Sequence, residues 1–285
     1  MTATIITGAA DDRRAVGATH QPARMAAVDK GAGNVVVLLH GFPGNAQDWE
    51  AVAAALEQDF RVIVPDLLGF GRSDAPGAFA GLTITAQADA LERLLAERGV
   101  ARCVLVGQDY GGPIAVTLAA RRPDLVAGLV LSSCNFFRDP ALQAPMKLLP
   151  VPGIGRAVEA ALFSPPSLRY MARNGTRRGK RLPAVNSPSE VASIRTIFAT
   201  ILRDLPTHFG AVEDALPALA VPVLVAWGDR DPFFAVPHAR RAADAIPGAR
   251  LRLYEGAGHF PHLEVTETYA RDIATLGAAA FAAER

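Results

Sequence analysis

Cysteine, aromatic residues and charge of one predominant sign are all scarce in this sequence. Its 285 residues include two cysteines, and aromatic residues make up 7% of the chain. Two cysteines are too few for the disulfide framework of a small secreted protein. We expect Cys103 and Cys134 to lie at opposite ends of two parallel strands, too far apart for a bridge. Both should be reduced thiols, which predicts a cytoplasmic protein.

Long runs of apolar or like-charged residues are also missing. No run reaches the roughly 18 apolar residues of a membrane span, and residues 1–17 lack the apolar core of a secretory signal. The 29 basic and 28 acidic residues nearly cancel, and the densest basic stretch, "RNGTRRGKR" at 173–181, is typical of a solvated loop. No zinc-ligand spacing occurs. We therefore expect no nucleic acid, no membrane and no metal as partners, and no prediction of oligomeric state follows.

Hydrophobic residues are abundant, and their pattern predicts an α/β fold. They make up 50% of the chain, enough for a continuous core. Apolar runs alternate with amphipathic stretches such as Thr83–Arg98 and Ile114–Arg122. Continuous apolar strands joined by helices indicate a mostly parallel sheet flanked by helices on both faces. The expected strands are Val35–Leu39, Val62–Pro65, Cys103–Val106, Gly128–Ser132, Val221–Trp227 and Arg250–Tyr254.

Two stretches do not follow this alternation. Residues 1–33 should supply a leading strand or two. Residues 136–215 are rich in proline, arginine and helical periodicity but contain no convincing strand. An interruption of about 80 residues between two core strands is too long for a loop. It should therefore be an inserted helical subdomain.

The turn after the first strong strand, "HGFPG" (40–44), has the small residues that let backbone N–H groups face a cavity. Such N–H groups suit an oxyanion hole, although an ordinary Gly/Pro turn is an equal alternative from this motif alone. The loop after the next strand, "PDLLGFGRSD" (65–74), carries Arg72 and Asp74, which we expect to brace the loop. Both loops follow strand ends, where ligands bind in open parallel sheets.

The third turn, "GQDYGG" (107–112), joins a strand to a helix through Asp109. A sharp strand-to-helix turn strains the backbone of its central residue and requires small residues two positions before and after, here Gly107 and Gly111. Asp109 should therefore project into the cavity above a helix N-terminus, whose dipole favours an ionised carboxylate. The alternative is an Asp that only caps the helix.

An acid and a histidine follow the last two strands. "GDRDP" offers Asp229 and Asp231, one of which should orient a histidine and stabilise its charged form. "GAGHFPHLE" places His259 in a glycine-flanked turn, where it is a candidate base, and His262 at the start of a helix, where it is an ordinary residue.

These five motifs, in this order, resemble those of the α/β-hydrolase superfamily from about residue 34 to 285. The resemblance implies an α/β-hydrolase fold with a helical cap inserted after the sixth strand: core segments at 1–135 and 216–285, and the cap at 136–215. It also implies the order nucleophile, acid, histidine for Asp109, Asp231 and His259, because the family's acid stands directly before the proline that is Pro232 here. The implied oxyanion donors are the backbone N–H groups of Phe42 and Tyr110.

An aspartate at this turn is similar to the epoxide hydrolases and to the haloalkane and haloacetate dehalogenases. In these families the aspartate attacks an sp³ carbon and leaves an alkyl ester on the enzyme. A histidine then activates the water that hydrolyses the ester. A serine would instead give an ether that water does not cleave. The resemblance implies that Asp109 is the nucleophile and His259 the base, without a cofactor.

The leaving group is predicted from residues near the nucleophile. Tyr110 and Phe42 stand where haloalkane dehalogenases carry halide-binding Trp or Asn, and Tyr110 also replaces the Arg of haloacetate dehalogenases. "HGFP" is the epoxide-hydrolase form of the oxyanion loop. That family protonates the epoxide with cap residues, for which Tyr170, with His208 as a helper, is the candidate. The Tyr110 hydroxyl could add a hydrogen bond to the leaving group.

We therefore predict an epoxide hydrolase that forms a vicinal diol. The alternatives are a haloalkane dehalogenase, an ester or lactone hydrolase that uses Asp109 as a base, and a non-enzymatic helper on a hydrolase scaffold. The apolar stretch at 136–155 predicts a small hydrophobic substrate.

Overall fold

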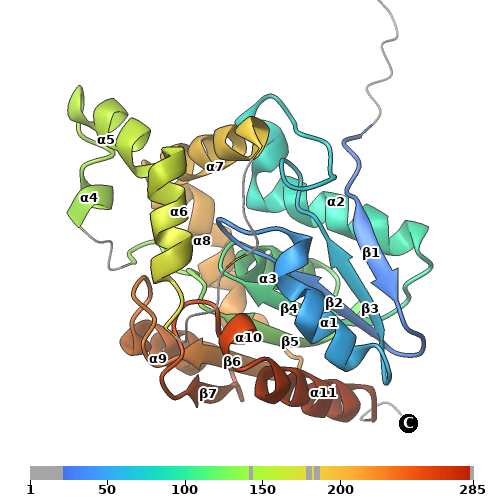
Figure 1. Cartoon of the computed structure of the whole chain (residues 1–285). Helices are drawn as coiled ribbons and strands as arrows, with labels where there is room; N and C mark the ends of the chain where they lie inside the picture. Colours follow the sequence, from blue (N-terminus) through green and yellow to red (C-terminus); the bar gives the residue numbers. More distant parts are fainter. Residues whose placement is uncertain (1–21, 141–143, 178–181, 183–186, 283–285) are drawn as a thin grey trace, which may run out of the picture.

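The computed structural model describes residues 22–140, 144–177, 182 and 187–282, which build a seven-stranded sheet covered by helices (Figure 1). The strands follow one another across the sheet in the order β1-β3-β2-β4-β5-β6-β7. All six strands expected from the sequence are present, with ends that differ by two residues at most. The strands are β1 (Ala27–Lys30), β2 (Val35–Leu39), β3 (Arg61–Pro65), β4 (Cys103–Gln108), β5 (Val126–Ser132), β6 (Val223–Gly228) and β7 (Arg250–Tyr254).

The sheet is parallel except at one edge, which confirms the prediction of a mostly parallel sheet. β1 pairs with β3 antiparallel, and every other neighbouring pair is parallel. The central strands β2, β4, β5 and β6 are buried along their whole length. Burial on both faces explains why their sequences are continuous apolar runs rather than alternating patterns.

Helices pack on both faces of the sheet, and two hydrophobic clusters separate them from the strands. α1 and α11 share one cluster, and α2, α3 and α9 share the other. The core helices are α1 (Glu50–Leu56), α2 (Ile84–Glu97), α3 (Gly111–Arg121), α9 (Val236–Ala245), α10 (Pro261–Glu264) and α11 (Thr266–Ala282), with short 3₁₀ helices η1 (Ala46–Trp49), η2 (Phe79–Leu82) and η3 (Leu216–Ala218).

A helical insertion separates β5 from β6 in the chain, as expected for residues 136–215. Its helices are α4 (Ala144–Lys147), α5 (Ile154–Leu162), α6 (Pro165–Asn174), α7 (Pro188–Ile201) and α8 (Leu205–Ala215). In Figure 1 they stand to one side of the sheet, with α4 and α5 farthest from it. Of the leading strand or two expected in residues 1–33, the described part contains β1, and residues 1–21 lie outside it. Counted from β1, the insertion follows the fifth strand.

The two cysteines are free thiols, as predicted. Cys103 begins β4 and Cys134 follows β5, so the sheet holds them at opposite ends of neighbouring strands. Across the described residues, no helix combines the length and the apolar character that crossing a membrane requires.

Candidate active site

Asp109 lies in the sharp turn between β4 and α3. Its φ of +49° is in the left-handed region, which residues other than glycine rarely adopt. Its backbone N–H donates to the carbonyl of Ser132 on β5 at 2.9 Å, which fixes the turn against the neighbouring strand. A Cβ at Gly107 would lie 2.5 Å from the Gly111 carbonyl oxygen and 2.7 Å from the Gly112 Cα. The turn therefore requires the glycine that the sequence pattern identified.

The loop after β2 holds one oxygen of Asp109. The backbone N–H of Phe42 donates to Asp109 Oδ1 at 2.9 Å. A Cβ at Gly41 would collide with the Asp109 side chain, so glycine allows this close approach. Of the two oxyanion donors expected, Phe42 thus contacts the carboxylate directly. In the described part of the chain, the N–H of Tyr110 makes no hydrogen bond to it.

Buried polar groups brace this loop from below. His40 accepts the Leu67 N–H at Nε2 over 3.0 Å, and its Nδ1 lies 3.0 Å from the Gly41 carbonyl oxygen. Asp66, 3% exposed, accepts the Ala46 N–H and the N–H groups of Arg72. The role expected of Arg72, bracing the loop, agrees with these contacts.

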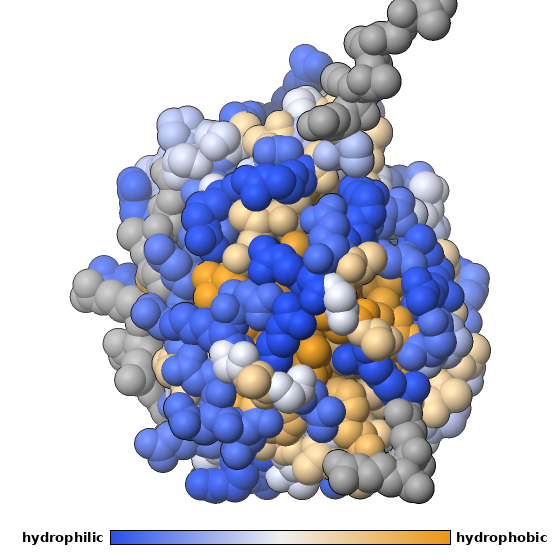
Figure 2. Space-filling model, turned by 90° about the vertical axis from the view of Figure 1, so that its right-hand side faces the viewer, coloured by the Kyte–Doolittle hydropathy of each residue, from blue (hydrophilic) through white to orange (hydrophobic). Residues whose placement is uncertain are grey.

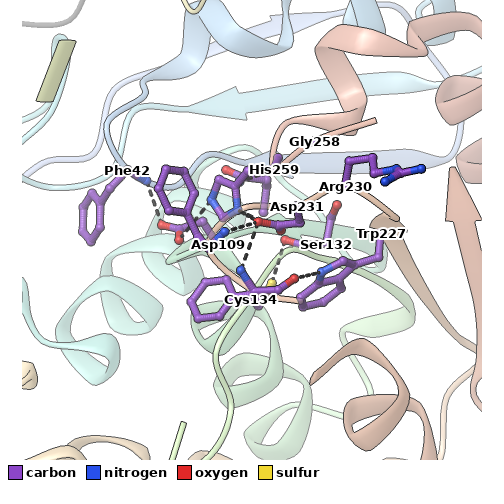
Figure 3. A network of polar contacts seen from close by, with 12 residues as sticks. Phe42, Asp109, Ser132, Cys134, Trp227, Arg230, Asp231, Gly258 and His259 are labelled. Atoms are coloured by element: carbon purple, nitrogen blue, oxygen red, sulfur yellow. Dashed lines mark hydrogen bonds and ion pairs between the residues drawn. The ribbon is translucent and has the colours of Figure 1, made fainter. Parts of the chain in front are cut away.

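His259 lies between two carboxylates (Figure 3). Its Nδ1 is 3.0 Å from Asp231 Oδ2, and its Nε2 is 3.5 Å from Asp109 Oδ2. Asp231 Oδ1 also accepts the backbone N–H groups of Phe233 and Phe234, which fix the orientation of this carboxylate. All three predicted residues, Asp109, Asp231 and His259, are therefore brought together by the ends of three separate strands.

The two other candidates after the last strands have different surroundings. Asp229 accepts the Gly256 N–H at 2.7 Å and braces the neighbouring turn. His262 is buried and stacks on Trp49 with ring centroids 4.2 Å apart. Burial, together with repulsion from His259, lowers the pKa of His262 to about 3. His262 is thus a packed imidazole in the first turn of α10, and the sequence had predicted an ordinary residue at the start of a helix there.

The charge state of His259 is set by opposing effects. Burial disfavours the imidazolium, but the attraction of Asp231 and the hydrogen bond with Asp109 outweigh burial. Together they raise the pKa of His259 to about 10. The two carboxyl groups on either side of the ring therefore favour the imidazolium form of His259 in the resting site.

The backbone of His259 is tied to the helical insertion, a connection that the sequence did not reveal. The His259 N–H donates to the Gly175 carbonyl at the end of α6 over 2.7 Å. Glu264 accepts the N–H of Gly258 on one oxygen, at 2.7 Å, and that of Arg177 on the other, at 2.6 Å. One buried carboxylate thus joins the histidine turn to the insertion.

Above Asp109 lies a cavity of about 120 Å³ that is almost entirely apolar. The insertion contributes Pro140, Met146, Leu168, Met171, Phe198, Ile201, Leu202, Leu205 and Phe209; the rest of the chain contributes Phe42, Pro43, Tyr110, Pro113, Phe233 and Phe234. The three remaining lining residues are Asp109, Asn135 and His259. No lysine or arginine is among them, so the lining favours an uncharged, apolar ligand.

Neither predicted proton donor of the insertion reaches this cavity. Tyr170 is 68% exposed, because it stands on α6 between Leu168 and Met171, whose common face lines the cavity. His208 precedes Phe209 on α8 and turns toward the ring of Phe79, 5.2 Å away. Helical geometry thus directs both side chains away from Asp109, contrary to the expectation from the sequence.

Tyr110 does not have the role expected of its hydroxyl, whereas Asn135 lines the cavity although the sequence did not point to it. The Tyr110 hydroxyl donates to the Leu82 carbonyl at 2.7 Å, so it points away from a leaving group, while its ring stacks on Phe42. Asn135 was not identified from the sequence, although it follows β5 at the same edge of the sheet. It bonds the N–H and carbonyl of Phe137, which leaves one hydrogen on its Nδ2.

A model of the alpha/beta hydrolase family matches residues 36–272, and the chain belongs to this family. The fold and the order of the site residues agree with that membership, so the protein is a hydrolase of the α/β class.

Its relatives include several kinds of hydrolase. An uncharacterized protein of Mycobacterium tuberculosis is 32% identical over 81% of this chain and 71% of its own length. Haloalkane dehalogenase 2 of the same organism is 29% identical over 73% of this chain and 74% of its own. The structure of a thermophilic esterase from Thermogutta terrifontis superposes with a TM-score of 0.68 at 28% identity, covering 90% and 93% of the two chains.

Proposed function

We propose that the protein hydrolyses an uncharged, apolar alkyl electrophile through an ester on Asp109, and that a halide is the leaving group that the site supports best. One observation carries the choice of leaving group: among the described residues, no hydroxyl group is free to protonate a departing oxygen in the cavity. Tyr110 donates elsewhere, and Tyr170 is not a lining residue. A halide needs no proton to leave.

In the first half of the reaction, Asp109 attacks carbon. Oδ1 is engaged by the Phe42 N–H, so Oδ2 is the attacking oxygen. The bond from Oδ2 to carbon forms as the carbon–halogen bond breaks, and the halide departs with the electron pair. Asn135 Nδ2 has one hydrogen left to donate to the halide within an otherwise apolar lining. The 29% identical haloalkane dehalogenase 2 supports this chemistry by similarity.

In the second half, water cleaves the ester. Esterification removes the negative charge of Asp109, which is one of the influences that raise the pKa of His259. The pKa of His259 therefore falls once the ester has formed, its proton passes to solvent as the halide leaves, and the neutral imidazole then takes a proton from water. The hydroxide attacks the ester carbon of Asp109, and the charge that develops on Oδ1 faces the Phe42 N–H. Collapse releases the alcohol, which takes its proton from His259, and the proton that the hydroxide brought to Asp109 passes back to His259, which restores the resting site.

The test is to trap the ester. His259→Gln blocks the water step, so mass spectrometry should find a stable adduct on the peptide that contains Asp109. A bromoalkane should add its alkyl group without bromine, and Asp109→Asn, its own mass verified, should add nothing. We expect turnover to fall by about 10⁴-fold or more in Asp109→Asn. Absence of an adduct across a panel of haloalkanes and epoxides would contradict the covalent mechanism.

Epoxide hydrolysis is the second candidate, because the raised pKa of His259 supplies one acid in the cavity. The imidazolium would protonate the epoxide oxygen as Asp109 attacks, and would then be neutral for the water step. The same trap separates the two reactions, because an epoxide adds its entire mass to the peptide. An ester hydrolase using Asp109 as a base would instead incorporate no oxygen from labelled water into Asp109 during a single turnover.

A further inference from the structure

The outer end of the helical insertion exposes apolar side chains. We define the tip as residues 147–170, which run from the end of α4 through α5 into α6. All four large hydrophobic residues that are exposed in the described part of the chain lie here: Leu148, Val151, Ile154 and Tyr170. Ile154 is 51% exposed. The apolar stretch at 136–155 was expected to face the substrate, but of its described residues only Pro140 and Met146 line the cavity.

The tip, together with the residues that flank it, concentrates positive charge. Residues 144–181 contain eight of the 29 lysines and arginines but one of the 28 acidic residues. The rest of the sequence therefore carries 21 basic and 27 acidic residues. A chain with a net charge of +1 is thus strongly polarised, with a cationic segment at 144–181 and an acidic remainder.

Four cations of this region have no ion-pair partner among the described residues. Lys147, Arg156, Arg169 and Arg173 are exposed. Among the ion pairs of the described residues none includes these four side chains. The single acid of the segment, Glu159, is instead occupied by Arg203 at 2.6 Å. The positive charge is therefore available to a partner.

We propose that the tip docks on the surface of an anionic phospholipid bilayer. Exposed aliphatic side chains beside unpaired Lys and Arg are the combination that holds a helix in the plane of a membrane interface. Nucleic acid would engage the cations but would leave Leu148, Val151 and Ile154 in water. A second copy of the chain, joined tip to tip, would bring two cationic surfaces together. The proposal departs from the expectation of no membrane partner, which rested on the absence of a membrane-spanning run; docking on a bilayer surface needs no such run.

The tip lies next to residues that line the cavity, so docking would bring the cavity close to the lipid. Met146, Leu168 and Met171 line the cavity, and each is next to or one turn from a residue of the exposed tip. A docked tip would hold the apolar cavity beside the phase in which apolar molecules accumulate. The side of the molecule that carries β1 and α2 is mostly hydrophilic, with smaller apolar areas (Figure 2). This inference does not depend on the leaving group or on the reaction at Asp109.

Co-sedimentation of the full chain with vesicles tests the proposal. We expect binding to vesicles of phosphatidylcholine with phosphatidylserine, little binding to phosphatidylcholine alone, and weaker binding as salt rises. Arg156→Glu and Ile154→Asp should each weaken binding by about tenfold or more. Neither side chain lines the cavity, and unchanged thermal unfolding would show that both variants fold. Lys30→Glu changes the net charge by as much as Arg156→Glu does. Lys30 is at the end of β1, away from the tip, so this variant should bind vesicles nearly as well as the wild type.

A fluorescent variant reports insertion directly. The two natural tryptophans, Trp49 and Trp227, are fully buried and lie outside the tip. Ile154→Trp therefore places a tryptophan at the tip, where its emission reports on contact with lipid. Its emission should shift to the blue with phosphatidylserine vesicles and not with phosphatidylcholine. The proposal is overturned if the wild-type chain does not bind anionic vesicles at low salt, or if Lys30→Glu and Arg156→Glu weaken binding equally. A dimer in sedimentation velocity that Ile154→Asp dissolves would assign the tip to self-association instead.

Discussion

The turn at Asp109 and the outer end of the insertion both contain glycine and tyrosine, but these residues have different surroundings in the two places. At the turn, glycines lie against backbone atoms, and Gly107 has no room for a Cβ. At the tip, a Cβ on Gly153 would meet nothing within 4 Å. Aromatic rings around Asp109 are buried, whereas Tyr170 is exposed to water. The reacting groups are thus held by tightly packed backbone, whereas the tip combines a close contact, Gly155 against the Leu149 carbonyl, with open space at Gly153 and an exposed Tyr170.

The largest effect that would test this contrast comes from a matched pair of glycine substitutions. Gly107→Ala forces a Cβ against the backbone of Gly111 and Gly112, and it should cost about 3 kcal/mol or more. Gly153→Ala has open space and a φ of +79°, so its cost is about 1 kcal/mol from backbone strain alone. Urea unfolding of both variants measures the difference. Equal losses would show that the tip is packed as tightly as the turn.

The pH dependence of stability tests the ion triplet at the centre of the rigid region. The pKa of His259 is raised to about 10 from 6.5, so the folded chain keeps a proton that the unfolded chain loses between these pH values. Stability from this group is complete below pH 6.5 and is lost as the pH rises toward 10. Between these two pH values, the folding equilibrium constant of the wild type should fall by an additional factor of about ten per pH unit compared with that of His259→Gln.

Unfolding curves at several pH values give this comparison, and other groups that titrate in both proteins cancel. Matching slopes for wild type and His259→Gln would mean that His259 is neutral in the resting site.

Glu264 connects the two regions, and its substitution measures how far the insertion controls the histidine. Glu264→Gln leaves a single acceptor oxygen for the N–H groups of Gly258 and Arg177. We expect hydrolysis of the ester to slow by about tenfold, because His259 is less well placed, while ester formation is nearly unchanged. Rapid-quench measurement separates the two steps, and Glu267→Gln, exposed on α11, is the control. Equal slowing of both steps would indicate a general structural role.

The smallest effect is expected at Tyr110. Tyr110→Phe removes the hydrogen bond to Leu82 and should cost about 1 kcal/mol in unfolding free energy. Activity should change little, since the hydroxyl does not face the leaving group. A loss of about 100-fold in turnover would instead be the size expected of a proton donor and would contradict the position of this hydroxyl.

The parts of the protein that follow strand ends were predictable from the sequence. Each strand is a short apolar run, and each turn carries its own local requirement for small residues. These features identified Asp109 and His259 and left Asp229 and Asp231 as alternative acids, between which the resemblance to the family chose Asp231; the fold brings Asp109, Asp231 and His259 together. Tyr170 and His208 were assigned by residue type and by their place in the chain. On a helix, however, a side chain one position from a lining residue points in another direction, and short amphipathic patterns do not specify which face is covered.

By itself, the sequence determined the parallel sheet, the place of the insertion and the residues at the turn, because hydrophobic period and glycine requirements are local properties. Tertiary structure alone decided which faces of the insertion line the cavity, that Asn135 lines it as well, and that Glu264 ties Gly258, beside His259, to Arg177. Those contacts join residues far apart in the chain. They depend on how helices rotate and pack against the sheet, and no local pattern records that packing.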